Sequence, residues 1–135
     1  MDRAELDRMR ELTLGLNVTE ERMARLRSRA ERVTALLDGL PHGSMRRSIV
    51  EESLTRIMAE FDKAAAMLTE LSGLRMAFEV QLSGAEMSDR ERLIMRLRYL
   101  DGLSWRRIGA LMVVSDGWLF KMHRRAAKKF YASDQ

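Results

Sequence analysis

The 135-residue sequence has no cysteine, only one proline (Pro41) and only two histidines (His42 and His123). Without cysteine the chain cannot form a disulfide and offers no thiolate to a metal. Two histidines far apart in the sequence are too few for a zinc site, so we expect neither a bound metal nor another cofactor. A sequence with a single proline, rich in Leu, Ala, Arg, Glu and Met, favours long helices.

Long apolar runs are absent as well. No stretch is long and apolar enough to span a bilayer, so we expect no association with a membrane. The charged N-terminus lacks the apolar core of a signal peptide, which makes the cytoplasm the expected compartment.

The residue patterns of common enzymes are also missing. No glycine-rich loop that could cradle a phosphate is present, and no nucleophile is paired with a base in a recognisable motif. Acidic pairs such as Glu20-Glu21 and Glu51-Glu52 lie in helical sequence, where solvated surface charge explains them. We therefore expect a protein that is not an enzyme.

The positive charge is concentrated near the C-terminus. The chain carries a net charge of +4, but residues 88–135 contain eleven Lys or Arg against five Asp or Glu, a surplus of six. Residues 1–87 contain thirteen against fifteen. A basic segment attached to a nearly neutral body points to a polyanionic partner that binds at one end of the chain.

The N-terminal region has helical periodicity. The spacing of Leu6, Met9, Thr13 and Leu16 predicts a short first helix that ends in Leu14-Gly15-Leu16-Asn17. Thr19 is the expected N-cap of a second helix that stops at Asp38-Gly39. Residues 39–44, which include Pro41, are expected to form a loop.

A third and longer helix follows, with apolar residues in alternating steps of four and three. This is a heptad pattern with one polar position, and such a helix cannot bury its apolar stripe alone. Its partner is the second helix folded back, a second copy of the chain, or both; the width of the apolar face favours a homo-oligomer, with a dimer as the first expectation. The stripe consists of Val50, Leu54, Ile57, Phe61, Ala64, Leu68, Leu71, Arg75, Phe78 and Leu82.

Three serines mark the starts of three short helices in the C-terminal segment. Ser88 and Glu91 form a capping-box pattern, while Ser104 and Ser115 are expected N-caps of the next two helices. Gly109 would let two helices cross closely, and Val113-Val114 makes a tight connection. The expected apolar faces are Leu93, Ile94, Leu97 and Leu100; Trp105, Ile108 and Leu111 or Met112; and Leu119, Met122, Ala126 and Phe130.

Two short helices joined by about three residues are typical of a helix-turn-helix. Residues early in the last helix would reach base edges in the major groove, and later cations would contact phosphates. The expected outer face of this helix comprises Asp116, Gly117, Phe120, Lys121, Arg124, Arg125 and Lys128, and Arg106 is a further candidate for DNA contact.

The stretch MSDRERLIMRLRYLDGLSWRRIGALMVVSDGWLFKMHRRAAKKF, residues 87–130, resembles the fourth conserved region of bacterial sigma-70-type factors. That region is a helix-turn-helix that reads the −35 promoter element. The resemblance rests on Ser88-Asp89-Arg90-Glu91, Arg98-Tyr99, Asp101-Gly102-Leu103-Ser104, Trp105, Ile108-Gly109, Ser115 and His123-Arg124-Arg125-Ala126.

The whole chain resembles small phage regulators of the ArpU/RinA type, which activate late or packaging genes. These regulators have a helical N-terminal half, a loop similar to Leu40-Pro41-His42-Gly43 and a sigma-like C-terminus. The resemblance implies a DNA-reading role for Gly117, Trp118, Lys121, Arg124 and Arg125. His123 also matches a family position, but its place beside Met122 favours packing or hydrogen bonding.

The sequence thus predicts an all-α protein in which an N-terminal helical hairpin or coiled coil precedes a helix-turn-helix domain. Residues 1–83 are the expected oligomerisation region and residues 84–135 the expected binding domain for double-stranded DNA. No segment resembles the sigma region that melts promoters, so a complete sigma factor is excluded. The alternatives are a DNA-packaging recognition subunit of the small-terminase kind and a module that docks on RNA polymerase.

Overall fold

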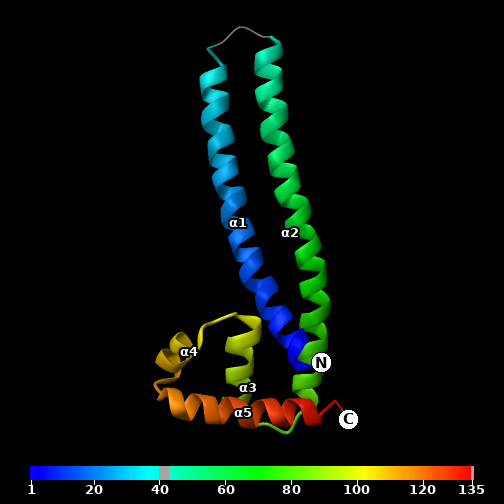
Figure 1. The fold of residues 1–135 in the computed structure, drawn as a ribbon, viewed down its shortest axis with the longest axis vertical. Helices are drawn as coiled ribbons and strands as arrows, with labels where there is room; N and C mark the ends of the chain where they lie inside the picture. The colour runs from blue at the N-terminus through cyan, green and yellow to red at the C-terminus, as the bar shows by residue number, and fades with distance from the viewer. Residues whose placement is uncertain (40–42, 135) are drawn as a thin grey trace. The chain divides into compact units, whose positions relative to one another are not determined.

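The computed structural model describes residues 1–39 and 43–134, and every regular element in these residues is helical (Figure 1). Leu40, Pro41 and His42 of the expected loop at residues 39–44 lie outside the described residues. None of the helices described combines the length and the apolar character that crossing a membrane requires. The elements are α1 (Arg3–Leu37), α2 (Ser44–Gly84), α3 (Asp89–Met95), the π-helical turn η1 (Arg96–Leu100), α4 (Trp105–Met112) and α5 (Asp116–Ala132).

The chain divides into two compact units. One consists of Met1–Leu14 together with Thr69–Gln135, and the other of Gly15–Leu68. The first unit therefore contains the beginning of α1 and the end of α2 as well as the expected DNA-binding segment 84–135.

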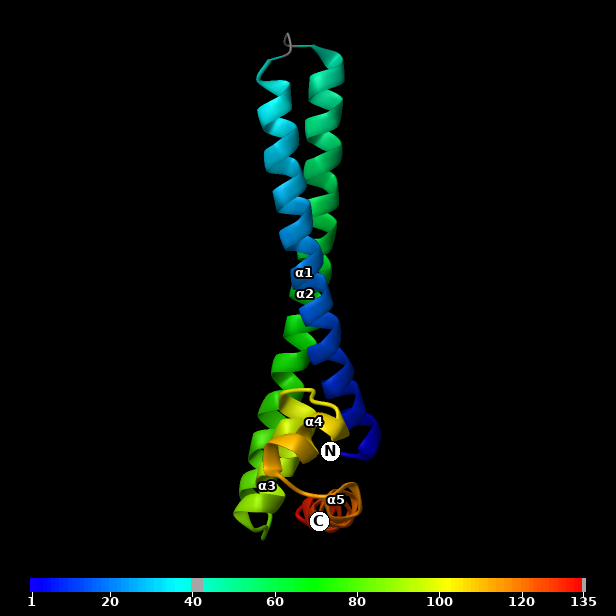
Figure 2. The same ribbon diagram turned by 90° about the vertical axis from the view of Figure 1, so that its left-hand side faces the viewer.

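In the unit Gly15–Leu68, α1 and α2 run antiparallel and side by side (Figures 1 and 2). The helices approach so closely at Gly15 that a Cβ atom there would lie 2.6 Å from the Cε atom of Met67. Thr19 is buried in the same contact, and Arg22 lies 3.7 Å from the Glu60 carboxylate. Helix α1 ends at Leu37, which confirms the expected stop at Asp38-Gly39.

The expected break between two N-terminal helices is wrong, because α1 is one continuous helix. Gly15 does not end a helix; its missing side chain makes room for Met67. Thr19 does not cap a helix either. Its hydroxyl donates a hydrogen bond of 2.9 Å to the carbonyl oxygen of Gly15, four residues earlier, which satisfies the hydroxyl within the helix.

The heptad stripe on α2 is covered unevenly. In the first compact unit, Leu71, Phe78 and Leu82 are buried. In the unit Gly15–Leu68, large apolar side chains on and beside the stripe keep between 41% and 64% of their surface exposed: Val50, Leu54, Met58, Phe61 and Leu68. Here α1 covers only part of the apolar face of α2.

The first compact unit contains a group of fully buried apolar side chains. The rings of Phe78 from α2 and Phe130 from α5 lie 5.4 Å apart, and both are fully buried. The side-chain amide of Gln81 donates to the carbonyl oxygen of Phe130 at 3.0 Å. Apolar side chains from the start of α1 are buried in the same unit: Leu6, Met9 and Leu12.

The three expected serine caps are confirmed. The hydroxyl oxygens of Ser88, Ser104 and Ser115 each accept a hydrogen bond from the backbone amide three residues later. Burial raises the pKa of Glu91, but hydrogen bonds from Lys129, at 2.9 Å, and from Ser88 outweigh this effect and hold the pKa below its usual range. The buried Glu91 carboxylate thus ties the start of α3 to α5.

The expected inner face of α3 is partly wrong. Leu93 is exposed, whereas Ile94, Met95 and Tyr99 are buried. The burial of Tyr99 follows from η1, where the backbone amide of Asp101 donates to the carbonyl oxygen of Arg96 five residues earlier and widens the turn. A wider turn shifts the following side chains around the helix axis, so a regular α-helical spacing misplaces them.

Candidate nucleic-acid interface

Helices α4 and α5 are joined by a tight connection of three residues, Val113, Val114 and Ser115. Val113 adopts the left-handed conformation, with φ 55° and ψ 53°. The backbone amide of Val114 donates to the carbonyl oxygen of Gly109 at 3.0 Å and closes the end of α4. Gly109 is buried where the helices meet, but a Cβ atom there would lie 3.5 Å from the nearest atom, so alanine also fits.

A small apolar cluster holds this arrangement together. Ile94, Ile108 and Leu119, from three different helices, are fully buried at its centre. Trp118 packs against the cluster and is half-buried, and the guanidinium of Arg90 lies 5.9 Å from its ring centre. The cluster fixes which side of α5 faces inward.

The opposite side of α5 is exposed and basic. Arg106 on α4 is exposed as well. Within residues 1–39 and 43–134, no carboxylate lies within 4.0 Å of the charged group of Arg106 or of any of the exposed cations of α5 given next. The exposed α5 residues that the sequence proposed for DNA contact are Gly117, Lys121, Arg124, Arg125 and Lys128.

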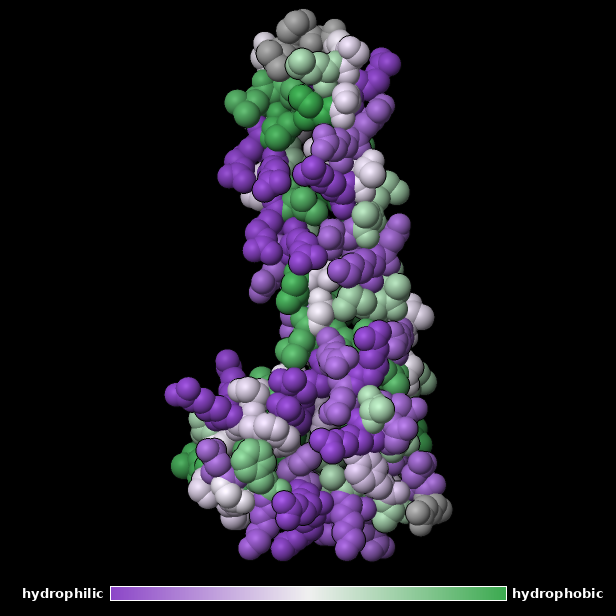
Figure 3. Space-filling view, in the orientation of Figure 1, coloured by the Kyte–Doolittle hydropathy of each residue, from purple (hydrophilic) through white to green (hydrophobic). Residues whose placement is uncertain are grey.

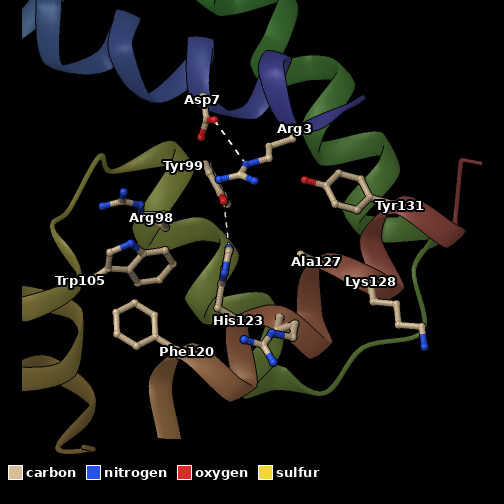
Figure 4. Close-up of a pocket in the computed structure, with 11 residues that line it drawn as sticks. Arg3, Asp7, Arg98, Tyr99, Trp105, Phe120, His123, Ala127, Lys128 and Tyr131 are labelled. Atoms are coloured by element: carbon tan, nitrogen blue, oxygen red, sulfur yellow. Dashed lines mark hydrogen bonds and ion pairs between the residues drawn. The ribbon is translucent and has the colours of Figure 1, made fainter. Parts of the chain in front are cut away.

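A pocket of about 680 Å³ adjoins this basic face (Figure 4). It lies between α5, the beginnings of α1 and α4, and η1. The lining is a mixture of aromatic and cationic side chains with one carboxylate. It consists of Arg3, Asp7, Arg98, Tyr99, Trp105, Phe120, His123, Arg124, Ala127, Lys128 and Tyr131.

His123 occupies the floor of the pocket and bonds Tyr99. Its Nε2 atom lies 2.9 Å from the Tyr99 hydroxyl oxygen, and its ring centre lies 4.5 Å from that of Trp105. The expected packing and hydrogen-bonding role of His123 is confirmed. Burial, together with Arg98 and Arg3, lowers the pKa of His123 to about 4, and burial raises the pKa of Tyr99 to about 12. Both groups are therefore neutral at pH 7.

Sequence reasoning identified the exposed cations of α5 but missed the pocket beside them. Arg124 and Lys128 belong to both. Arg3 and Arg98 supply the other cationic side chains of the pocket. Arg3 is more than ninety residues away in the sequence from every other cation of the pocket. No local pattern links such distant positions, whereas the face of α5 follows from helical spacing alone.

Among the described residues, no group of three or more His, Asp or Glu side chains is arranged to hold a metal ion. His42 lies outside these residues. Comparison of the chain with known protein families, with curated protein sequences and with solved structures finds no match.

Proposed function

We propose that this protein is a non-enzymatic, sequence-specific DNA-binding transcriptional regulator of phage or prophage type that works in the cytoplasm. Helices α4 and α5 act as a helix-turn-helix, and α5, which begins after Ser115, enters the major groove. The observation that carries the proposal is the exposed side of α5, where Lys121, Arg124, Arg125 and Lys128 have no carboxylate partner in the described part of the chain.

Charge and geometry support this function together. Cations left without partners on one helix face leave a positive potential that phosphates can neutralise. Gly117, near the start of α5, lets the helix backbone approach a base edge closely, because no atom lies within 4 Å of the Cβ position there. Lys121 and Arg124 follow one and two turns later, where they reach base edges and phosphates. Arg106 on α4 supplies a further phosphate contact.

Trp118 has a supporting role in this proposal. It packs against the apolar cluster and beside Arg90 rather than extending fully into solvent. Its main contribution is to hold the start of α5 in place, and its exposed part contacts the DNA backbone.

The proposed regulator is a homo-oligomer, with a dimer as the simplest form. Figure 3 shows hydrophobic side chains among the hydrophilic ones along the two long helices. In the unit Gly15–Leu68, Leu54, Met58, Phe61 and Leu68 follow each other at helical spacing and remain about half exposed or more. A groove of about 330 Å³ is lined by Met23, Ile57 and Phe61, among others. A second copy that brings the same stripe would cover both surfaces.

The test is a fluorescence-anisotropy titration with DNA fragments from the region that surrounds the protein's own gene, at several salt concentrations. We expect tight binding to one fragment, with a slope of log K against log salt of about −0.9 for each phosphate neutralised. Weak and equal binding to all fragments would contradict the proposal and favour docking on RNA polymerase. A ring-sized oligomer that binds only beside packaging genes would favour the small-terminase alternative.

The double variant Lys121→Ala/Arg124→Ala should abolish specific binding while circular dichroism and mass in solution stay unchanged. The matched control is Arg29→Ala/Lys63→Ala, which removes the same charge from exposed positions on α1 and α2. The control should retain the preferred fragment and nearly all of its affinity. Equal losses in both variants would reduce the interaction to non-specific charge attraction.

A further inference from the structure

The pocket beside α5 has a strong excess of positive charge. Arg3, Arg98, Arg124 and Lys128 line it, whereas Asp7 is its only carboxylate among the described residues. The Asp7 carboxylate already lies 3.9 Å from the guanidinium of Arg3 (Figure 4). A molecule that enters this pocket therefore meets a site that favours an anion.

The pocket also offers an aromatic surface with room beside it. Trp105 is largely occupied, because the guanidinium of Arg98 covers its ring at 4.4 Å and Phe120 meets it edge-on, with ring centres 5.7 Å apart. Phe120 itself is 49% exposed. Tyr131 lines the other end of the pocket (Figure 4). Phe120 is thus the ring on which a planar ligand can stack.

The aromatic and cationic groups follow each other along one side of α5. Arg124 and Lys128 lie one and two turns after Phe120, which corresponds to about 6 Å and 12 Å along the helix axis. A ligand with a flat ring at one end and an anionic group at the other would satisfy both kinds of side chain. A volume of about 680 Å³ lies within the usual range for small-molecule sites.

We propose that this pocket binds a free nucleotide, with the base stacked on Phe120 and the phosphate held by Arg124 and Lys128. Arg3 faces the bound phosphate from the α1 side of the pocket. Neutral His123 and Tyr99 form an uncharged floor that does not compete for the anion. A nucleotide at a single-stranded DNA end has the same chemistry, and the experiment below separates the two sources.

A regulatory consequence rests on the proposed function. Arg124 and Lys128 belong both to the pocket and to the face of α5 assigned to DNA. A nucleotide phosphate bound to these cations neutralises them, so DNA and nucleotide compete for the same side chains. Nucleotide binding would then release the protein from its DNA site.

Trp105 makes the pocket accessible to a spectroscopic test. The variant Trp118→Phe leaves Trp105 as the only tryptophan, and its fluorescence is followed during titration with AMP, with adenosine and with inorganic phosphate, in the absence of DNA. We expect a saturable change with AMP and affinities lower by about ten-fold or more for adenosine and for phosphate, because each lacks half of the contacts. Calorimetric titration of the unaltered chain with AMP checks that the substitution has not changed the site.

Two single variants locate the binding site. Phe120→Ala and Arg124→Ala should each weaken AMP binding by about ten-fold. Arg125→Ala removes a neighbouring cation of α5 that does not line the pocket, and it should leave AMP binding unchanged. Equal effects of Arg124→Ala and Arg125→Ala, or no saturable signal at millimolar AMP, would overturn the proposal. Binding of a short single-stranded oligonucleotide without binding of AMP would overturn it too.

A DNA titration with and without AMP then tests the competition. If AMP binds but the chain has no affinity for any DNA fragment, the pocket stands and the proposed function fails. If one fragment binds tightly but AMP does not bind, the proposed function stands and the pocket assignment fails. If both bind, AMP should raise the apparent Kd for DNA.

Discussion

Val113 has a strained backbone conformation. It is the one non-glycine residue with a positive φ among residues 1–39 and 43–134. A β-branched residue in this conformation costs about 1–2 kcal/mol because its Cβ substituents crowd the following carbonyl oxygen. The side chain is 88% exposed and returns little packing energy. The connection between α4 and α5 therefore holds strain that a glycine would relieve.

The variant Val113→Gly should stabilise the protein by about 0.5–1.5 kcal/mol, since relief of strain exceeds the added entropy of the unfolded chain. Urea unfolding followed by circular dichroism measures the change. Val114→Gly is the control, because Val114 is half-buried against the apolar cluster and lacks a positive φ. It should destabilise the protein. Lower stability of Val113→Gly than of the unaltered chain would show that Val113 contributes contacts beyond its backbone.

His123 gives the stability of the protein a specific dependence on pH. Its pKa is lowered from 6.5 to about 4, first by burial and then by Arg98 and Arg3. The unfolded chain therefore binds a proton more readily than the folded chain between these two values. Stability should be complete above about pH 6.5 and fall as the pH drops towards 4, by at most about 1.4 kcal/mol for each unit of pKa difference.

Urea unfolding at a series of pH values, with an NMR titration of the His123 ring, measures this effect. His123→Gln should flatten the dependence between about pH 6.5 and 4. A decline below that range should remain, because Glu91 has a lowered pKa and its contribution disappears as the pH falls through that pKa. An imidazole that titrates near 6.5 in the folded protein would contradict the burial of His123.

At the scale of elements, features fixed by a few adjacent residues were predictable. The caps at Ser88, Ser104 and Ser115 need only a hydroxyl and an amide three residues later, so their pattern is visible in the sequence. The stop of α1 before Gly39 and the inner face of α5 have the same local origin.

Features that depend on distant residues were not predictable. Gly15 and Thr19 carry the local signature of a helix end and a new start, but contact with Met67 decides the outcome. The π-helical turn η1 turns Tyr99 inward, and the spacing of apolar residues contains no sign of the extra residue in that turn. The pocket was not predictable because two of its side chains, Arg3 and Asp7, are far in the sequence from the rest of its lining, residues 98–131.

The exposed stripe on α2 makes a prediction about assembly. Leu68→Asp places a charge on a half-exposed stripe residue, so the chain should still fold but the proposed oligomer should dissociate. Light scattering coupled to size-exclusion chromatography measures the mass, and circular dichroism checks helicity. Ala59→Asp introduces the same charge at an exposed α2 position outside the stripe and should leave the mass unchanged. An unaltered mass for Leu68→Asp would count against the coiled-coil interface.

At the scale of the whole molecule, the segment 84–135 depends on residues outside it. Leu71, Phe78 and Leu82 of α2, with Leu6 and Met9 of α1, are fully buried in the same compact unit. Burial of each such side chain contributes about 1.5–3 kcal/mol, so their combined loss is comparable to the stability of a whole domain.

A fragment of residues 84–135 should therefore unfold without a cooperative transition in a thermal melt. The matched control is a chain in which a short glycine-serine linker joins residues 1–14 to residues 69–135, which restores the compact unit. It should melt cooperatively. A cooperative transition of the isolated fragment would show that the segments 1–14 and 69–83 are dispensable for folding.

Because this compact unit combines two segments that are far apart in the sequence, its folding depends on the order in which the segments are synthesised. Residues 1–14 are synthesised before the intervening segment 15–68, and their partners in 69–135 are synthesised after it. The apolar side chains of the first segment thus remain uncovered until these later residues have been made, and closing the long intervening loop adds an entropic cost. Folding of the unit that carries α5 therefore waits for residues made well after its first segment, so a polypeptide interrupted within 69–135 would not present its basic helix on a stable scaffold.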